Sequence, residues 1–447
     1  MNNGTPPYFG IREFGAKGDG RTNDAKAIQA AIDACGKAGG GTVLCPPGVY
    51  FIGSIQLRSN VQLHLVAGAT LLGSAQRGDF SVFDRGVSDQ VRDINYAPEH
   101  LIYAENETNV AITGMGEIDG NGRAYFGPVT AATNNKYSIK NKWRPIQLVA
   151  FVNCRNVTLE GVTFRDAPGW TIWPLGCDGV RITGIKIHND PRGPNSDGID
   201  IDTCRNVIIS DCLIEAGDDC ISCKSDKSKK PVLTACEYVT VTNCILKTTC
   251  CALRIGYEGD HPVRHCRFGN LVIKGTRVGI SILAPRKPGF CIEHGPAIED
   301  ISFSDMIMDT DIPFFLWTGA DVVPPAGIRG IRFHNITATT ERGCHCGGSE
   351  ASPLEDISFS NIDISVRGPM DSEFAKEVPY PYSEWDYNTK RGIPHVFYFR
   401  HAKGIRLNNI RVEWKKAAGA WLSALRTECV EDMSINGFSE TGKPRQA

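Results

Sequence analysis

One short strand-like pattern returns along most of this chain, and it limits the folds that the chain can adopt. Each copy alternates apolar and polar residues and is rich in Val, Ile, Thr and Phe, which is typical of a half-buried β-strand. Val157, Val180 and Val207 occupy equivalent places in three successive copies, 23 and 27 residues apart. The copies begin at Thr108, Arg155, Asp178, Arg205, Glu237, Glu299, Arg329, Glu355, Lys403 and Glu431.

The segments between these copies carry no helical periodicity, which excludes a fold built from strand–helix–strand units. A strand unit repeated at such intervals is typical of a parallel solenoid, in which each repeat forms one coil and buries its apolar face on its neighbours. We therefore expect an all-β chain that folds as a single-stranded, right-handed parallel β-helix, with residues 1–447 in one domain. Asn at the end of many copies fits the bends between sheets, because Asn tolerates left-handed backbone conformations.

Three segments depart from the repeat. Residues 24–38 place Ile28 and Ile32 on one face and are followed by glycines, which predicts a short helix that caps the N-terminal end of the solenoid. Residues 120–142 and 369–394 break the rhythm, and we expect both to project as loops that carry binding residues. The second loop holds Trp385 among several tyrosines, which suits the wall of a sugar cleft or an oligomer contact.

The net charge and the number of cysteines limit the binding partners and the cellular compartment that we expect for this chain. The chain has 48 basic and 50 acidic residues and a net charge of −2, so charge gives no reason to expect nucleic acid or an anionic membrane as a partner. No apolar run reaches the roughly 18 residues that a membrane span needs. The 17 cysteines are odd in number, whereas secreted proteins usually pair cysteines in even sets. With no signal peptide at its start, we expect a cytoplasmic protein, with a secreted mature form as the alternative; the oligomeric state stays undefined.

Three aspartates stand out in the segments PNSDGIDID and EAGDDCISCK. Asp197 precedes Asp218 by 21 residues and Asp219 by 22, which is close to one coil. Because neighbouring strands lie about 4.8 Å apart, the three carboxylates should cluster on one face of adjacent coils. Repulsion between like charges in such a cluster raises the pKa of at least one member. Glycoside hydrolysis needs this combination, since one carboxylic acid protonates the leaving oxygen while an ionised carboxylate activates water.

The same segments have two other interpretations. Asn, Asp and Gly are common turn formers at the corners of coils. Clustered carboxylates also suit a hard cation such as Ca²⁺. Two such segments in consecutive coils favour catalysis, and we expect neither a metal ion nor another cofactor.

The chain resembles glycoside hydrolase family 28, which contains the polygalacturonases and has the right-handed parallel β-helix as its fold. The resemblance extends from the opening FGAKGDGRTNDAKAIQAAIDAC through GGGTVLCPPGVY, RPIQLVAFVNCRNV and GWTIWPLGCDGV to the last repeats. Its most specific pieces are NSDG at residues 195–198, similar to the family's Asn-Thr-Asp-Gly, and GDDCISCK at residues 217–224, similar to its Gly-Asp-Asp segment.

The resemblance implies a role for each matched residue. Asp218 would be the general acid that protonates the glycosidic oxygen, and Asp197 and Asp219 would activate the hydrolytic water. Members of the family invert the anomeric configuration, which requires room for a water molecule between acid and base. Asn195 and Lys224 would hold substrate hydroxyls or orient the carboxylates.

Two motifs of the family are missing from this chain. Where the family has Gly-His-Gly, the chain reads CCALRIGYE, with Cys251 at the histidine position and Arg254 in place of a serine. The family's Arg-Ile-Lys, which binds the galacturonate carboxylate, aligns with Ser-Ile-Leu at residues 281–283. The loss of these cations removes the charge-assisted pairing that selects an acidic sugar. Arg254, Arg286 and Lys287 are candidates to compensate, although the alignment puts none of them in the same place.

We therefore predict an inverting glycoside hydrolase that acts on a pectin-type or related plant or microbial poly- or oligosaccharide other than plain polygalacturonate. The expected catalytic residues are Asp197, Asp218 and Asp219, and the expected substrate-binding residues are Asn195, Lys224, Arg254 and Trp385. A polysaccharide lyase or epimerase on the same scaffold is one alternative, and a non-catalytic carbohydrate-binding solenoid is another. The absence of a secretion signal favours small imported oligosaccharides and an exo-type cut.

Overall fold

The computed structural model of the chain describes residues 8–83, 98–129, 135–140, 143–225, 232–287, 292–368, 393–415 and 419–442. Backbone contacts divide the chain into two compact units: unit 1 comprises Met1–Ile221 and Ser228–Leu233, and unit 2 comprises Ser222–Lys227 and Thr234–Ala447. The boundary falls within β22 (Ile221–Ser225). In the described part of the chain, no helix is long and apolar enough to cross a membrane.

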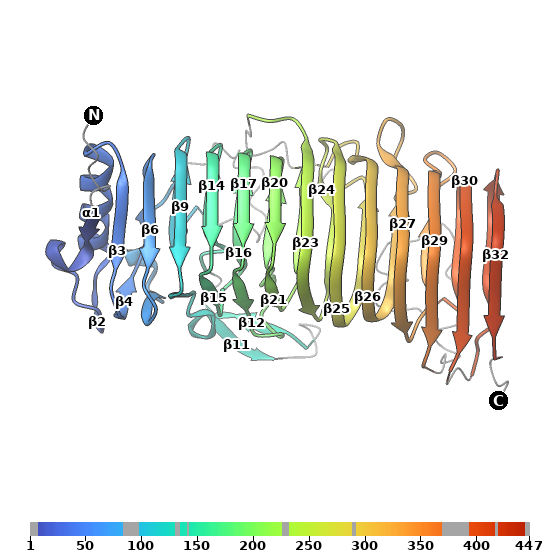
Figure 1. Cartoon of the computed structure of the whole chain (residues 1–447), viewed down its shortest axis with the longest axis horizontal. Coiled ribbons are helices and arrows are strands. Elements are labelled where there is room, and N and C mark those ends of the chain that lie inside the picture. Colours follow the sequence, from blue (N-terminus) through green and yellow to red (C-terminus); the bar gives the residue numbers. More distant parts are fainter. Residues whose placement is uncertain are drawn as a thin grey trace. The chain divides into compact units, whose positions relative to one another are not determined.

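Three parallel sheets run along unit 1. The first coil contributes strands to two of them, and the coils after it contribute a strand to all three. The first sheet contains β1 (Tyr8–Gly10), β3 (Gly41–Cys45), β6 (Val61–Leu65), β9 (Thr108–Gly114), β14 (Arg155–Glu160), β17 (Asp178–Thr183) and β20 (Arg205–Ser210). The second contains β2 (Asp19–Asn23), β4 (Gly48–Ile52), β7 (Ala69–Gly73), β10 (Glu117–Asp119), β15 (Thr163–Arg165), β18 (Lys186–His188) and β21 (Leu213–Ala216). The third contains β5 (Ile55–Gln56), β8 (Ile102–Glu105), β13 (Gln147–Val152), β16 (Trp170–Leu175) and β19 (Ile199–Asp202). Figure 1 shows successive strands of the first sheet side by side.

The register of unit 1 follows the sequence repeat. Val157 pairs with Val180, and Val180 pairs with Val207, so equivalent positions of successive coils stack on one another. At the corners, Asn109 and Asn156 have φ angles of 57° and 55°. Asn156 Nδ2 donates a hydrogen bond to Asn109 Oδ1 at 3.1 Å, so the bends of neighbouring coils are linked by side-chain amides. The predicted parallel β-helix and its left-handed Asn corners are confirmed.

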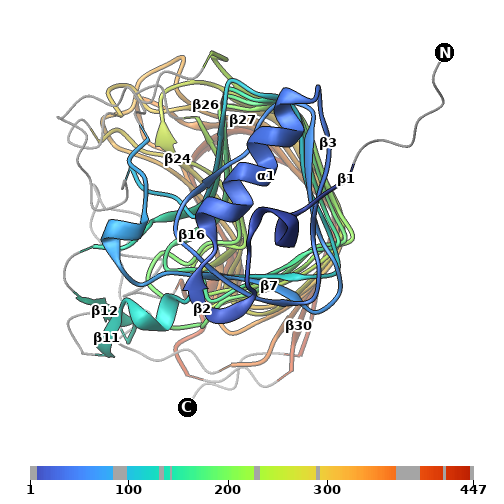
Figure 2. The ribbon, with the colours of Figure 1, turned by 90° about the vertical axis from the view of Figure 1, so that its left-hand side faces the viewer.

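The helix α1 (Ala25–Lys37) crosses the N-terminal end of unit 1, as Figure 2 shows. Its buried face consists of Ile28, Ala31, Ile32 and Cys35, and it contacts β1, β3, β5 and β6. The helix thereby covers the open end of the first coil, where exposed strand edges would invite pairing with other chains. The predicted capping helix over residues 24–38 is confirmed, one residue shorter at each end.

Short helical turns and a hairpin complete unit 1. The 3₁₀ helices are η1 (Ile11–Phe14), η2 (Arg77–Asp79) and η4 (Gly122–Ala124). Within the insertion at residues 120–142, β11 (Phe126–Val129) and β12 (Tyr137–Ile139) pair antiparallel, and Figure 1 draws them below the coils. The insertion therefore contains an ordered hairpin where the sequence predicts only a loop. Of the second predicted loop, residues 369–392 lie outside the described residues.

Unit 2 also consists of parallel coils, but most of its strands are longer and continue around the bends. They are β23 (Cys236–Thr248), β24 (Cys251–Gly259), β25 (Val263–Ala284), β26 (Ala297–Thr318), β27 (Gly327–Thr340), β28 (Cys344–Gly347), β29 (Leu354–Val366), β30 (His395–Trp414), β31 (Ser423–Glu431) and β32 (Ser434–Thr441). Ile301 pairs with Ile331, and Ile331 pairs with Ile357, again in the register of the repeat. The rings of Phe303 and Phe333 stack at 5.2 Å in the interior.

Candidate active site

The three aspartates singled out by the coil spacing lie together in unit 1. Asp197 lies in the turn before β19, and Asp218 and Asp219 lie one coil further on, in the turn between β21 and β22. One carboxylate oxygen from each of the three lies within 4.8 Å of the others. The structure therefore brings these side chains into one cluster, as expected from equivalent positions on adjacent coils.

Backbone hydrogen bonds hold the turn before β19 against the turn between β21 and β22. Gly198 N donates to Asp219 O at 2.8 Å, and Gly217 N donates to Ser196 O at 3.1 Å. A Cβ atom on Gly198 would lie 2.4 Å from the carbonyl oxygen of Cys220, and one on Gly217 would lie 2.3 Å from Ser196 Oγ. Only glycine permits this approach. The glycines of the two motifs thus determine how close the carboxylates of adjacent coils can lie.

The three carboxylates differ in their access to solvent. Asp197 and Asp219 are 4% exposed, whereas the side chain of Asp218 is 21% exposed. A ligand that arrives from solvent therefore meets Asp218 most readily. Accessibility is a requirement for the group that protonates a leaving oxygen of the substrate.

Arg144 supplies a buried positive charge beside this cluster. Its Nη2 donates to Asn195 Oδ1 at 2.9 Å, and its Nη1 donates to the carbonyl oxygen of Pro168 at 2.6 Å. Burial lowers the pKa of Arg144 to about 10, and the negative charges of Asp197 and Asp218 oppose that shift. Arg144 therefore fixes the turn that carries Asn195 and offsets part of the negative charge of the cluster.

Lys136 contacts the cluster from the hairpin. Its Nζ lies 3.0 Å from Asp218 Oδ2 and also donates to the carbonyl oxygen of Gly217. The strand repeat and the motifs of the sequence point to neither Lys136 nor Arg144 as a site residue. The sequence feature that could have directed attention to Lys136 is the break in the strand repeat at residues 120–142. The carboxylates form a donor set that a hard cation could use, but Lys136 and Arg144 already bring positive charge to them.

The predicted substrate-binding residues have different surroundings. Asn195 has a φ of 50° and lies beside the cluster, where Arg144 holds its amide oxygen. Lys224 belongs to unit 2, is nearly fully buried, and lies with its Nζ 2.7 Å from Glu258 Oε2. Trp385 lies outside the described residues. The roles assigned to these side chains stay predictions.

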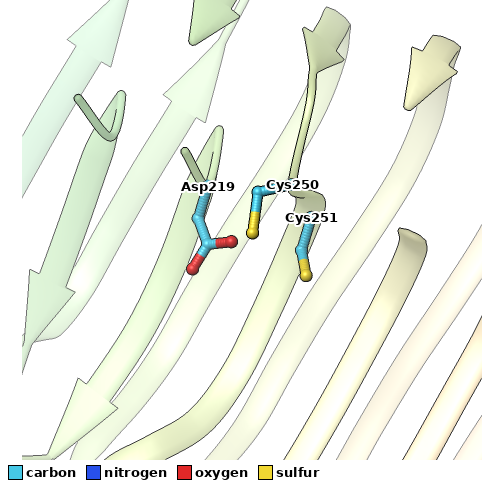
Figure 3. A group of neighbouring side chains, drawn as sticks. All are labelled: Asp219, Cys250 and Cys251. Carbon is cyan, nitrogen blue, oxygen red and sulfur yellow. The ribbon is translucent and has the colours of Figure 1, made fainter. Parts of the chain in front are cut away.

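Arg254 also belongs to unit 2 and is directed at two thiols. Cys250 and Cys251, drawn as sticks in Figure 3, lie where β24 begins. Arg254 Nη2 lies 3.2 Å from Cys251 Sγ. The Arg254 guanidinium lies 5.2 Å from the centre of the Tyr257 ring. In the register of β24 and β25, Arg254 pairs with Ser281, the residue that aligns with the arginine of the family's Arg-Ile-Lys. This chain thus carries an arginine one coil before the expected position.

Known proteins resemble this chain in sequence. A match to "Glycosyl hydrolases family 28" covers residues 53–383, and a match to "Rhamnogalacturonase A/epimerase, pectate lyase-like" covers residues 8–86. A probable polygalacturonase from Vitis vinifera is 29% identical over 390 residues, which are 82% of this chain and 75% of the relative. An exopolygalacturonase from Zea mays is 29% identical over 386 residues, which are 82% and 86% of the two chains.

Solved structures agree on the fold. The family 28 exopolygalacturonase of Yersinia enterocolitica has a TM-score of 0.71 and 19% identity, over 97% of this chain and 79% of that one. An exopolygalacturonase from Thermotoga maritima has a TM-score of 0.63 and 21% identity, over 96% and 92%. At these identities the likeness concerns the parallel β-helix alone. The family match, in contrast, covers well over half of the chain and includes all three clustered aspartates. The chain belongs to glycosyl hydrolase family 28 and is a glycoside hydrolase.

Proposed function

We propose that this chain hydrolyses glycosidic bonds in pectin-type oligosaccharides, with Asp218 as general acid and with Asp197 and Asp219 activating the attacking water. One observation carries the proposal: an oxygen from each of these carboxylates lies within 4.8 Å of the others, on adjacent coils. The polygalacturonases among the relatives support a pectic substrate.

The arrangement of the cluster supports a division of roles. Three carboxylates this close repel one another, and the uptake of one proton by the cluster relieves that repulsion. Asp218, as the most exposed member, gives its proton to the glycosidic oxygen while the bond to the anomeric carbon breaks. Asp197 and Asp219 accept a proton from the water that attacks this carbon. Each turnover consumes one water and creates one new reducing end.

The stereochemical outcome needs a test of its own. The family resemblance implies inversion, and inverting carboxylate pairs usually stand roughly 6.5–9.5 Å apart, against about 5–5.5 Å in retaining enzymes. The nearest oxygens of this cluster lie within 4.8 Å, so their spacing does not itself favour inversion. We propose inversion, and proton NMR of the first-formed product anomer checks it. A retained anomer would contradict inversion and make one aspartate a nucleophile.

The composition of one aligned segment supports a substrate other than plain polygalacturonate. Ser281, Ile282 and Leu283 replace the family's Arg-Ile-Lys, and all three are buried. They offer no cation to a galacturonate carboxylate. Because the cations that the family uses to select an acidic sugar are absent from this segment, we propose a mixed or decorated pectic substrate.

Product analysis on a panel of glycans tests the reaction class. We expect new reducing ends without the ultraviolet absorbance of an unsaturated uronide, and faster cleavage of rhamnogalacturonan oligosaccharides than of homogalacturonan. An unsaturated product would identify a lyase. Binding without any product would identify a non-catalytic carbohydrate-binding protein.

Substitution of Asp218 tests the assignment of roles. We expect Asp218→Asn to lower kcat by about 10³-fold, because the amide cannot donate the proton to the leaving oxygen. Its thermal unfolding midpoint should stay close to that of the unchanged protein. Asp178→Asn is the matched control, since Asp178 forms an ion pair with Arg205 at 2.8 Å elsewhere in unit 1. If Asp218→Asn keeps more than about a tenth of kcat, Asp218 is not the general acid.

A further inference from the structure

Two adjacent cysteines lie where the chain passes from β23 to β24 in unit 2. Cys250 lies in the bend between these strands, and Cys251 is the first residue of β24. Cys250 N donates to Thr248 Oγ1 at 3.1 Å, which fixes the bend. The two Sγ atoms lie within 4.8 Å of each other, and Figure 3 shows both side chains pointing in the same direction. The bend therefore places two thiols side by side, although successive residues of a regular strand point to opposite faces.

Two guanidinium groups of unit 2 donate to these sulfur atoms. Arg277 Nη2 lies 3.2 Å from Cys250 Sγ. Arg254 Nη2 lies 3.6 Å from Cys250 Sγ and 3.2 Å from Cys251 Sγ. Burial opposes the charge of Arg277, but its two cysteine neighbours raise the pKa of Arg277, and the net shift is upward. The sulfur atoms thus stabilise the guanidinium cation, and the cation in turn stabilises a thiolate at Cys250.

The stacking of the coils explains the contact between Arg277 and Cys250. In the register of β24, β25 and β26, Cys250, Arg277 and Asp311 occupy one position on three successive coils. Asp311 also acts electrostatically on Arg277. Arg277 therefore lies between a thiol and a carboxyl group, at about 4.8 Å per coil. An ionised Cys250 completes an alternation of negative, positive and negative groups along this column.

The two thiols differ in their access to solvent and in their contacts. Cys250 is 6% exposed and receives both guanidiniums, whereas Cys251 is fully buried and receives one. The thiolate is the form of cysteine that attacks an oxidant, and a second thiol beside it converts the first product into a disulfide. The contacts therefore assign the attacking role to Cys250 and the resolving role to Cys251.

We propose that Cys250 and Cys251 form a redox-active dithiol that takes a peroxide as its oxidant. The Cys250 thiolate attacks one oxygen of hydrogen peroxide, the O–O bond breaks, and hydroxide leaves, so that Cys250 becomes a sulfenic acid. Cys251 Sγ then attacks Cys250 Sγ, the S–O bond breaks, and the hydroxyl group leaves with the thiol proton of Cys251 as water. One thiolate and one thiol are oxidised to a disulfide, while the peroxide is reduced to one hydroxide and one water. This chemistry does not depend on the proposed hydrolysis of glycosidic bonds.

Alkylation of the folded protein tests the thiolate. Iodoacetamide is added at about pH 6, where an ordinary thiol is mostly protonated, and mass spectrometry quantifies the tryptic peptide of residues 248–254, which contains both cysteines. We expect Arg277→Gln to lower the labelling rate of Cys250 by about tenfold or more, because the thiolate loses a guanidinium partner. Arg264→Gln is the matched control on the same strand, since Arg264 forms an ion pair with Glu237 at 2.8 Å. A rate that stays the same or rises in Arg277→Gln would overturn the thiolate, because the shorter side chain only improves access.

A measurement on the unchanged protein makes this test independent of how well the variant folds. Between about pH 6 and pH 8 the labelling rate of Cys250 in the folded protein should change by less than about threefold, because most of this thiol is already ionised. In urea-unfolded protein the rate should rise by about a hundredfold, because the ionised fraction of an ordinary thiol grows about tenfold per pH unit. Equal pH dependence in the folded and the unfolded protein would also overturn the thiolate.

Treatment with hydrogen peroxide tests the dithiol itself. We expect the peptide of residues 248–254 to lose two hydrogen atoms and to regain them with dithiothreitol, as a disulfide does. Cys251→Ser should stop the reaction at the sulfenic acid, which dimedone traps on Cys250. Cys429→Ser is the control, since Cys429 is an exposed cysteine of unit 2, and this variant should form the same disulfide. Peroxide that leaves Cys250 and Cys251 reduced, or that oxidises Cys250 without forming a disulfide in the unchanged protein, would overturn the proposal.

Discussion

The guanidinium of Arg144 is a positive charge buried in the interior of unit 1, where oxygen atoms accept hydrogen bonds from its N–H groups. It donates to Asn195 Oδ1, to Pro168 O and to Pro194 O, and it is 5% exposed. These acceptors lie on two successive coils. A buried guanidinium is tolerated only when such bonds replace its hydration. The residue therefore connects the turn that carries Asp197 to the coil before it.

Loss of this guanidinium should destabilise the protein. Arg144→Met leaves buried oxygens without donors, and we expect the free energy of unfolding to fall by about 2–4 kcal/mol. We also expect kcat to fall, because the turn that carries Asn195 loosens. Urea unfolding and steady-state kinetics check both effects. Arg165→Met is the control: this surface arginine pairs with Asp119 at 3.3 Å, and its loss should cost under about 1 kcal/mol. Equal stability of the two variants would contradict the structural role of Arg144.

At the scale of the elements, the corner between coils of unit 1 depends on asparagine. Asn60, Asn109 and Asn156 have φ angles of 62°, 57° and 55°. Asn109 Nδ2 donates to Asn60 Oδ1 at 2.8 Å, and Asn109 Oδ1 accepts from Asn156 at 3.1 Å. The same side chain thus tolerates the left-handed bend and links three coils. Both properties contribute to the alignment of β6, β9 and β14.

Two substitutions at Asn109 separate these contributions. Asn109→Ala loses the amide bonds and places a Cβ in the left-handed region, so we expect it to lower the free energy of unfolding by about 1–3 kcal/mol. Asn109→Gly loses the same bonds, but glycine adopts this φ without strain, so its loss should be smaller. Urea unfolding of both variants gives the comparison. An equal loss would mean that backbone strain plays no part at this corner.

At the scale of the whole molecule, stability should depend on pH through histidines of unit 2. Burial lowers the pKa of His345 to about 3 and that of His395 to about 4. In the unfolded chain both titrate near the ordinary value of 6.5. As pH falls from about 6.5 towards 4, these two histidines bind protons in the unfolded state but stay neutral in the folded state. Stability should then fall by up to about 1.4 kcal/mol per pH unit for each histidine, with no contribution from them above pH 7.

Replacement of one histidine tests this dependence. His345 packs against Phe315 and Tyr398 at ring distances of 5.3 Å and 5.6 Å, so His345→Phe should keep the packing and remove one titrating group. We expect its loss of stability between pH 6.5 and pH 4 to be clearly smaller than that of the unchanged protein, by urea unfolding at each pH. His334→Gln changes an exposed histidine and serves as the control. Identical slopes for all three proteins would contradict the prediction.

The fold was largely predictable because its information is local and repeated. Alternation at period 2 identifies the strands, and the spacing of Val157, Val180 and Val207 predicts which residues pair across coils. The same arithmetic groups Asp197 with Asp218 and Asp219, since in-register parallel strands place equivalent positions side by side. The capping helix followed from its amphipathic face and the glycines after it.

The cations of the site were not predictable in this way. Lys136 lies 82 positions before Asp218, and Arg144 lies 51 positions before Asn195. The first distance is not a whole number of coils, and the insertion that carries Lys136 has no strand repeat. The second distance is close to two coils, but the strand repeat does not single out Arg144 as a site residue. Its antiparallel hairpin and the aromatic packing of Phe126 and Tyr137 decide where Lys136 points.

The amino-acid sequence by itself determined the coils, their register and the clustering of three aspartates. The physical reason is that regular hydrogen bonding between repeats stacks equivalent positions of neighbouring coils on one another. Only the tertiary structure decided which positive charges face those aspartates. That outcome depends on how a non-repeating hairpin packs its side chains against the coil, and no periodicity encodes such a contact.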